Sequence, residues 1–176
     1  MKFILLMVAL CFSISPMSRS DIKAFNRTYE MLIAGFETRQ YKETSFFGKK
    51  AIEDYKIIPL DKREKIQPLQ VRYIAIFRMV ALSELHISVA LTQDSINIVR
   101  NQKDYQAMNR LIQKGRSEIL GSGILEKKDS SSHYFSSIIA NFDAVRDSIP
   151  MFIENDYRKA SNINSKREIA EKYSQF

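Results

Sequence analysis

Apolar residues recur at steps of three and four along most of the chain, which predicts a series of amphipathic helices. The first apolar stripe runs from Ile22 to Phe36. The second runs from Phe47 to Ile58, where Pro59 stops the helix. Because the joint between the two segments is short, we expect them to form an antiparallel hairpin.

The most apolar segment begins after Pro68, a residue that suits the first position of a helix. Within residues 69–91, the stretch YIAIFRMVAL holds Arg78 as its one charge. A membrane span and a helix buried on several sides both produce such a pattern. Polar residues from Ser83 to Ser88 interrupt the segment too often for a span. We therefore expect a central buried helix and no transmembrane span in the mature chain.

Residues 87–99 permit two interpretations. Ile87, Val89 and Leu91 alternate with polar or small residues, as in a short β-hairpin that turns at residues 92–95. Helix-forming segments flank this stretch on both sides, so continuous helix is the favoured interpretation. The β-hairpin is the minor alternative.

The rest of the chain predicts more helices with short loops between them. Their apolar stripes cover residues 105–120, 135–149 and 150–160, and a capping box at residues 165–168 precedes a final short helix. The predicted fold class is all-α, with six to eight amphipathic helices in an antiparallel bundle or a stack of helical hairpins. We expect residues 21–176 to form a single helical domain, because their number suits one sizeable core.

The first twenty residues differ from the rest. Lys2 precedes an apolar run from Phe3 to Ile14, and small polar residues follow. This run is short for a membrane-spanning helix and has the length of a signal-peptide core. We therefore expect residues 1–20 to be a cleaved signal peptide and the mature protein to be periplasmic or extracellular. Tethering to the membrane through residues 1–20 is the alternative.

The single cysteine, Cys11, lies inside this apolar run. Lipid attachment would need a small residue before it, and Leu10 stands there, so we interpret Cys11 as an apolar residue of the signal core. The mature chain would then contain no cysteine. An exported protein without disulfides depends on its own core for stability.

The charge pattern indicates a solvated surface. The formal net charge is +7, and it falls to +5 when Lys2 and Arg19 leave with residues 1–20. Basic residues come in scattered pairs close to acids, such as Lys127 and Lys128. A nucleic-acid binding protein would concentrate such charges on one element, so nucleic acid is a disfavoured partner. An anionic membrane or cell-wall polymer is the alternative to a protein partner.

Candidate chemistry is sparse. His86 follows Glu84 by two residues, and residues at that spacing do not share a helix face. His133 lies beside Asp129 after a run of serines, whereas a catalytic triad needs residues from separate elements and an oxyanion hole. Five glycines leave little room for a phosphate-binding loop. We predict no catalytic, cofactor-binding or metal-binding residues, and a hydrolase is the least favoured function.

Two stretches of the predicted hairpins are similar to each other in sequence. QYKETSFFGKKAIED, which begins at residue 40, aligns with DYQAMNRLIQKGRSE, which begins at residue 104. In this alignment Tyr41 pairs with Tyr105, and small Ala51 pairs with small Gly115. The two stretches are therefore candidates for one structural unit that occurs twice.

Both stretches resemble the second helix of a tetratricopeptide repeat, in which an aromatic residue opens the helix and a small residue later permits close packing. The spacing of 64 residues differs from the 34 of that family, and Thr44 and Met108 stand where the family has a small alanine. The resemblance implies stacked helical hairpins that bind another macromolecule.

We therefore expect an exported, non-enzymatic binding or scaffold protein with a protein partner. A basic, envelope-associated protein is the alternative. The predicted interaction surface consists of the tyrosines and basic residues of the two echoing stretches: Tyr41, Lys49, Lys50, Tyr105, Arg110 and Lys114.

Overall fold

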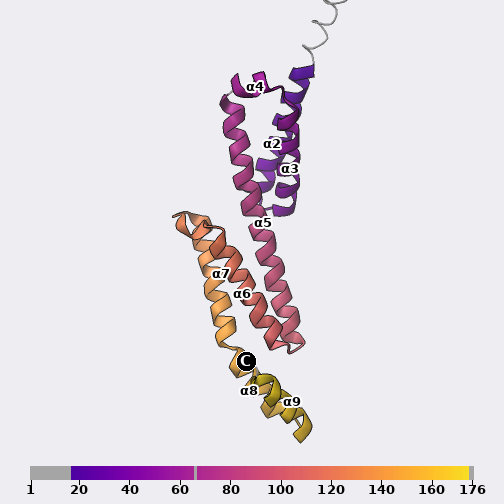
Figure 1. The fold of residues 1–176 in the computed structure, drawn as a ribbon, viewed down its shortest axis with the longest axis vertical. Coiled ribbons are helices and arrows are strands. Elements are labelled where there is room, and N and C mark those ends of the chain that lie inside the picture. Colours follow the sequence, from indigo (N-terminus) through magenta and orange to yellow (C-terminus); the bar gives the residue numbers. More distant parts are fainter. Residues whose placement is uncertain (1–16, 66, 175–176) are drawn as a thin grey trace, which may run out of the picture. The chain divides into compact units, whose positions relative to one another are not determined.

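The computed structural model describes residues 17–65 and 67–174. These residues form α-helices, one 3₁₀ helix and no strand, so the predicted all-α fold of six to eight helices is confirmed. The elements are α2 (Met17–Glu37), α3 (Tyr41–Ile57), α4 (Leu60–Lys65), α5 (Gln67–Asn101), α6 (Tyr105–Gly121), η1 (Ile124–Glu126), α7 (Ser130–Asp147), α8 (Ile149–Lys159) and α9 (Ile163–Ser174) (Figure 1).

The predicted signal peptide falls mainly on residues 1–16, which lie outside the described residues, as does Cys11. Helix α2 begins at Met17, so the predicted cleavage after Ser20 falls in its first turn. The signal peptide stays a prediction.

Residues 87–99 are helical, which rules out the β-hairpin alternative. They belong to α5, which continues without a break from Gln67 to Asn101. The buried residues of this stretch, Val89, Thr92 and Ile96, follow steps of three and four. The alternation at Ile87, Val89 and Leu91 was therefore a coincidence within a helical stripe.

The chain divides into two compact units, residues 1–87 and 88–176. Helix α5 contributes its first part to unit 1 and its second part to unit 2. The expectation of a single domain over residues 21–176 stays a prediction, and each unit is described by itself.

Unit 1 is a helical hairpin closed by a third helix. Helices α2 and α3 lie side by side, and the first part of α5 packs against both (Figure 1). Their buried side chains form one core: Phe25, Leu32, Ala51, Tyr55, Ile58, Leu69, Ile76 and Val80. Gly48 permits the close approach of α5, since a Cβ there would lie inside van der Waals contact with Val80 Cγ2.

Unit 2 repeats this plan with the second part of α5, then α6, then α7. A Cβ on Gly115 of α6 would lie 2.7 Å from Phe142 Cε2 of α7 and 3.0 Å from Thr92 Cγ2 of α5. The three helices therefore meet at Gly115. Asp129 caps α7, and its Oδ1 accepts hydrogen bonds from the N–H groups of Ser131 (3.0 Å) and Ser132 (3.1 Å).

The turns of the two hairpins have the same geometry. Arg39 and Lys103, 64 residues apart, both adopt the left-handed conformation, with φ of 59° and 60°. The next residue in each turn donates its N–H back to the preceding helix, from Gln40 to Gly35 O at 2.8 Å and from Asp104 to Val99 O at 2.9 Å. Such bonds satisfy carbonyl groups at the end of the first helix.

The similarity between the stretches that begin at residues 40 and 104 extends through both helices of each hairpin. At the same spacing of 64, these pairs are buried in their own units: Phe25 and Val89, Thr28 and Thr92, Leu32 and Ile96, Thr44 and Met108, Gly48 and Ile112, Ala51 and Gly115, Tyr55 and Ile119. The structure thus contains the same hairpin twice. Its assignment to the tetratricopeptide family stays a prediction.

Helix α5 is not the central buried helix that its composition suggested. On its first part, Val71, Ile74 and Phe77 are 61, 71 and 49 % exposed. They lie opposite the face that packs on α2 and α3, because two helices cover only one side of a third. By length and composition residues 68–101 are apolar enough to cross a membrane, and 22 % of the most apolar window is buried. One helix of this kind is weak evidence of a membrane span, because core helices of soluble proteins have the same length and composition.

We predict that Gly48→Ala destabilises unit 1 by about 1–3 kcal/mol, because the new methyl overlaps Val80, a β-branched side chain with little freedom to move. The control is Gly121→Ala, since a Cβ there meets nothing within 4 Å. Urea unfolding should show a lower midpoint for Gly48→Ala and an unchanged or higher midpoint for the control. Equal midpoints for the two variants would contradict this packing.

Candidate functional site

A third hairpin follows α7. Pro150 lies in the first turn of α8, where its missing N–H removes no hydrogen bond. Asn162 caps α9, since its Oδ1 accepts a hydrogen bond from the Ser165 N–H at 2.8 Å. The predicted capping box at residues 165–168 was therefore wrong about where the last helix begins. Ser165 lies inside the first turn, and α9 begins at Ile163.

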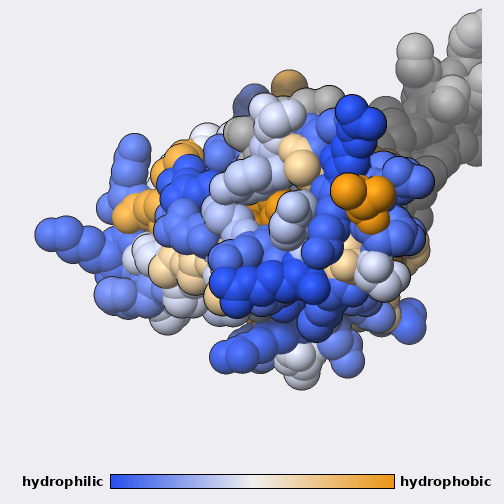
Figure 2. All heavy atoms as spheres, turned by 90° about the horizontal axis from the view of Figure 1, so that it is seen from below, coloured by the Kyte–Doolittle hydropathy of each residue, from blue (hydrophilic) through white to orange (hydrophobic). Residues whose placement is uncertain are grey.

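The third hairpin leaves apolar side chains exposed. None of the residues of α9, all of which the structure describes, is buried. In Figure 2, which views the end that carries α8 and α9, orange apolar atoms appear in small patches among blue hydrophilic side chains. Helix α9 is amphipathic, with Ile169 and Tyr173 on its apolar stripe. The stripe is only partly covered, since Ile169 is half-buried and Tyr173 is exposed.

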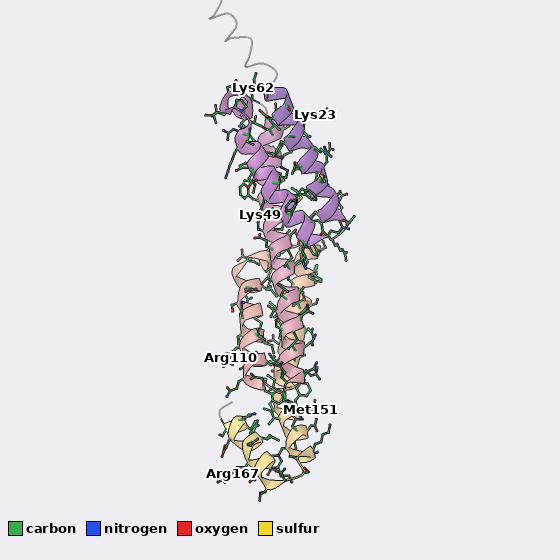
Figure 3. All side chains as sticks on the ribbon, turned by 90° about the vertical axis from the view of Figure 1, so that its right-hand side faces the viewer. Lys23, Lys49, Lys62, Arg110, Met151 and Arg167 are labelled. Carbon is green, nitrogen blue, oxygen red and sulfur yellow. The ribbon has the colours of Figure 1, made fainter. Side chains whose placement is uncertain are left out.

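A groove of about 570 Å³ lies between the two helices of this hairpin. We call it the α8–α9 groove. Met151 on α8, labelled in Figure 3, and Tyr157 are 53 and 43 % exposed. The lining residues are Asp147, Pro150, Met151, Ile153, Glu154, Tyr157, Ile169, Ala170 and Tyr173. The groove is thus mainly apolar, with two carboxylates among its lining residues.

A second hollow of about 530 Å³ lies beside the first residues of α6. Ile153, Ile169 and Tyr173 line both hollows, so the two lie on either side of the contact between α8 and α9. The remaining residues of this Tyr105 hollow are mostly polar: Gln102, Lys103, Asp104, Tyr105, Gln106, Asp156 and Lys172.

A half-buried carboxylate, that of Asp156, joins α6 to α8 in the Tyr105 hollow. The Tyr105 hydroxyl donates to Asp156 Oδ2 at 2.8 Å, and Lys103 Nζ lies 3.1 Å from Asp156 Oδ1. Burial, and then the hydrogen bond to Asp156, raise the pKa of Tyr105 to about 12. Tyr105 is therefore a neutral hydrogen-bond donor at neutral pH, and the arrangement holds α8 in place without supplying a base or a nucleophile.

The predicted interaction residues of unit 1 are engaged within that unit. The ring of Tyr41 stacks on His86, with centroids 4.0 Å apart. Lys49 Nζ lies 2.8 Å from Glu84 Oε1, and this contact is the main cause that lowers the pKa of Glu84. Burial, and then the charge of Arg39, lower the pKa of His86, so the stacked imidazole favours its neutral form. Lys50 lies 3.5 Å from Asp54.

The predicted residues of unit 2 are dispersed. Tyr105 lines a hollow, and Lys114 lies 3.8 Å from Glu118 of the same helix. Arg110, labelled in Figure 3, is exposed on α6. The six predicted residues thus fall three in each unit. Within unit 2 they form no common surface around either hollow, and the interaction surface they define stays a prediction.

Sequence reasoning did not single out the residues of the α8–α9 groove. Ile153, Tyr157, Ile169 and Tyr173 fit the helical stripes, and such stripes are usually buried. The stripe of a helix predicts an apolar face but not whether another element covers it. The sequence therefore carries no signal that separates the exposed side chains of this hairpin from the buried ones of the other two.

Among residues 17–65 and 67–174 there is no group of three or more histidine, cysteine, aspartate or glutamate side chains that could hold a metal ion. No protein-family model, no curated protein and no solved structure matches the chain. A function for the chain can therefore be inferred only from its own geometry.

We predict that Tyr105→Phe destabilises the attachment of α8 by about 1 kcal/mol, because it removes a hydrogen bond to a carboxylate in a partly exposed site. Folding favours the neutral phenol, so this contribution is present at neutral pH and is lost as the pH rises from 10.0 to about 12. Absorbance titration should show one tyrosine fewer ionising near pH 12. Tyr134→Phe, on exposed Tyr134, should keep that signal. Unchanged titration of Tyr105→Phe would contradict the assignment.

Proposed function

We propose that the chain is a non-enzymatic helical binding or scaffold protein that recognises another protein through the α8–α9 groove. We further propose that it is exported, with residues 1–20 as its signal peptide and the periplasm or the extracellular space as its location. The observation that carries the binding function is an amphipathic hairpin whose last helix buries no residue.

The composition of the groove supports a protein partner. Tyr157 and Tyr173 are exposed aromatic side chains with polar tips, and such residues are enriched in protein interfaces. Met151 has a flexible, polarisable side chain that adapts to different apolar partners. Together they offer apolar contact area with hydrogen-bonding groups, which favours a folded or folding polypeptide over a small polar ligand.

The charges of the chain support the same proposal. Most cations near the predicted interaction surface are paired, as Lys49 is with Glu84 and Lys103 with Asp156. Paired cations contribute less to the binding of a polyanion, because the partner acid must be displaced. The apolar groove therefore offers the stronger basis for recognition.

We predict that a photo-crosslinking amino acid at Met151 forms a discrete adduct with one protein when the chain is expressed in its source organism. The same amino acid at Ala140, which is exposed on α7 outside the groove, is the matched control and should give no such adduct. Mass spectrometry of the adduct identifies the partner. No adduct at either position, or equal adducts at both, would contradict the proposed function.

A second candidate function is binding to an anionic membrane surface. It is favoured by the exposed apolar face of α5 at Val71, Ile74 and Phe77, which lies next to the exposed cation of Arg78. Helices that lie in a membrane interface combine such an apolar face with basic residues. In this case the chain would associate with the envelope through unit 1.

We predict for this second function that the protein co-sediments with phosphatidylglycerol vesicles at low salt and is released at physiological salt, because screening weakens the attraction between exposed charges. Ile74→Glu should abolish the binding, whereas Leu91→Glu, on an apolar residue exposed elsewhere on α5, should not. If both variants bind like the parent protein, or if the parent protein does not bind, the exposed face of unit 1 does not recognise membranes.

A further inference from the structure

The third hairpin repeats the first helix of the other two. At the spacing of 64 residues, the buried residues Val89, Thr92 and Ile96 of α5 correspond to three residues of α8 and its C-terminal end, namely Ile153, Asp156 and Ala160. Ile153 is buried, and the other two are half-buried. The three residues follow the steps of three and four found in Phe25, Thr28 and Leu32 of α2. Helix α8 thus repeats the burial pattern of the two first helices, whereas α9 begins at Ile163, six residues before the position that the same spacing assigns to Tyr41 and Tyr105.

In unit 1, one face of the first helix is covered by α5. Arg72 Nη1 of α5 donates to Asn26 Oδ1 of α2 at 2.6 Å, and its guanidinium lies 5.3 Å from the centroid of the Tyr29 ring. Leu69 and Ile76 of α5 belong to the same apolar core as Phe25. The face of α2 made by Phe25, Asn26 and Tyr29 is therefore the position of the closing helix.

The corresponding face of the third hairpin lines the α8–α9 groove. Two repeats further along the chain, Phe25, Asn26 and Tyr29 correspond to Ile153, Glu154 and Tyr157, and all three line the groove. Within the described residues no element fills this position, so the groove is open where α5 closes unit 1.

The second helix of the third hairpin also carries a small residue in the groove, although its position matches that of Gly48 only when it is counted from the start of the helix. Gly48, where α5 comes closest to α3, is the seventh residue after the first residue of α3. Ala170 is the seventh residue after the first residue of α9, and it is exposed in the groove. A small residue and an exposed aromatic residue, Tyr173, thus lie together on the side of α9 that lines the groove.

We infer that the α8–α9 groove takes an amphipathic helix of a partner protein, in the position that the first part of α5 occupies in unit 1. The inference rests on the proposed function and names its partner class. The recognised helix carries large apolar residues at the spacing of Leu69, Ile76 and Val80. A basic residue of that helix at the place of Arg72 would face Glu154, which corresponds to Asn26 and whose printed ion pair is an exposed i, i+4 contact with Arg158.

The test uses the full chain and a fluorescent synthetic peptide of residues 68–87, which carries the apolar stripe that closes unit 1. Fluorescence anisotropy should show saturable binding at micromolar concentrations. Ala170→Arg should weaken the binding at least tenfold, because it places a long cation in the groove. Ala140→Arg, also on an exposed helical alanine but outside the groove, should leave the binding unchanged. A peptide with Glu at the positions of Ile76 and Val80 should not bind.

Equal weakening by the two arginine variants, or no binding of the peptide, would overturn the inference. Sedimentation velocity of the parent protein without peptide tests whether a second copy of the chain occupies the groove. A dimer that dissociates in the Ala170→Arg variant would place that copy in the groove and would also overturn the inference. Failure of the peptide together with a specific adduct at Met151 would leave the proposed function standing with a non-helical partner. Absence of both would reject the proposed function as well.

Discussion

The structure depends on one packing constraint: a helical hairpin buries its apolar face only when a third helix closes it. In unit 1 this contact is centred on Gly48, which lets Val80 of α5 approach α3. In unit 2 it is centred on Gly115, where Phe142 of α7 and Thr92 of α5 meet. A larger residue at either glycine would separate the helices, and the loss of tight packing would fall on the core of that unit.

This constraint is the reason why we propose the third hairpin as the site of recognition. Helices α8 and α9 form a hairpin whose first helix repeats the burial pattern of α2, but within the described residues no helix closes it, and the apolar side chains of the groove stay accessible. Tyr105 and Lys103 hold Asp156, so α8 is anchored to α6 even though its groove is open. An anchored hairpin would lose little conformational entropy if a partner closed it, which is consistent with the proposed binding function.

Much of the fold could be predicted from the sequence. Apolar residues at steps of three and four placed most helices, and the prolines at residues 59 and 150 placed two helix boundaries. The pairing of Tyr41 with Tyr105 located the repeated hairpin. The exposed face of α5 was not predictable, because the apolar sequence of a helix does not determine how many of its sides are covered by neighbouring helices. The groove was missed for the same reason: Tyr157 and Ile169 have the pattern of core residues, and their exposure follows from the absence of a neighbour within the described part of unit 2.

The most direct test of this account is amide hydrogen exchange of the full chain, resolved helix by helix. The amides of α3 and α6, each closed by a third helix, should exchange at least about 100-fold more slowly than those of α9, because exchange through local opening follows the apolar contacts that the opening breaks. Equal protection of α9 and α6 would show that the third hairpin is already closed, and it would contradict the account.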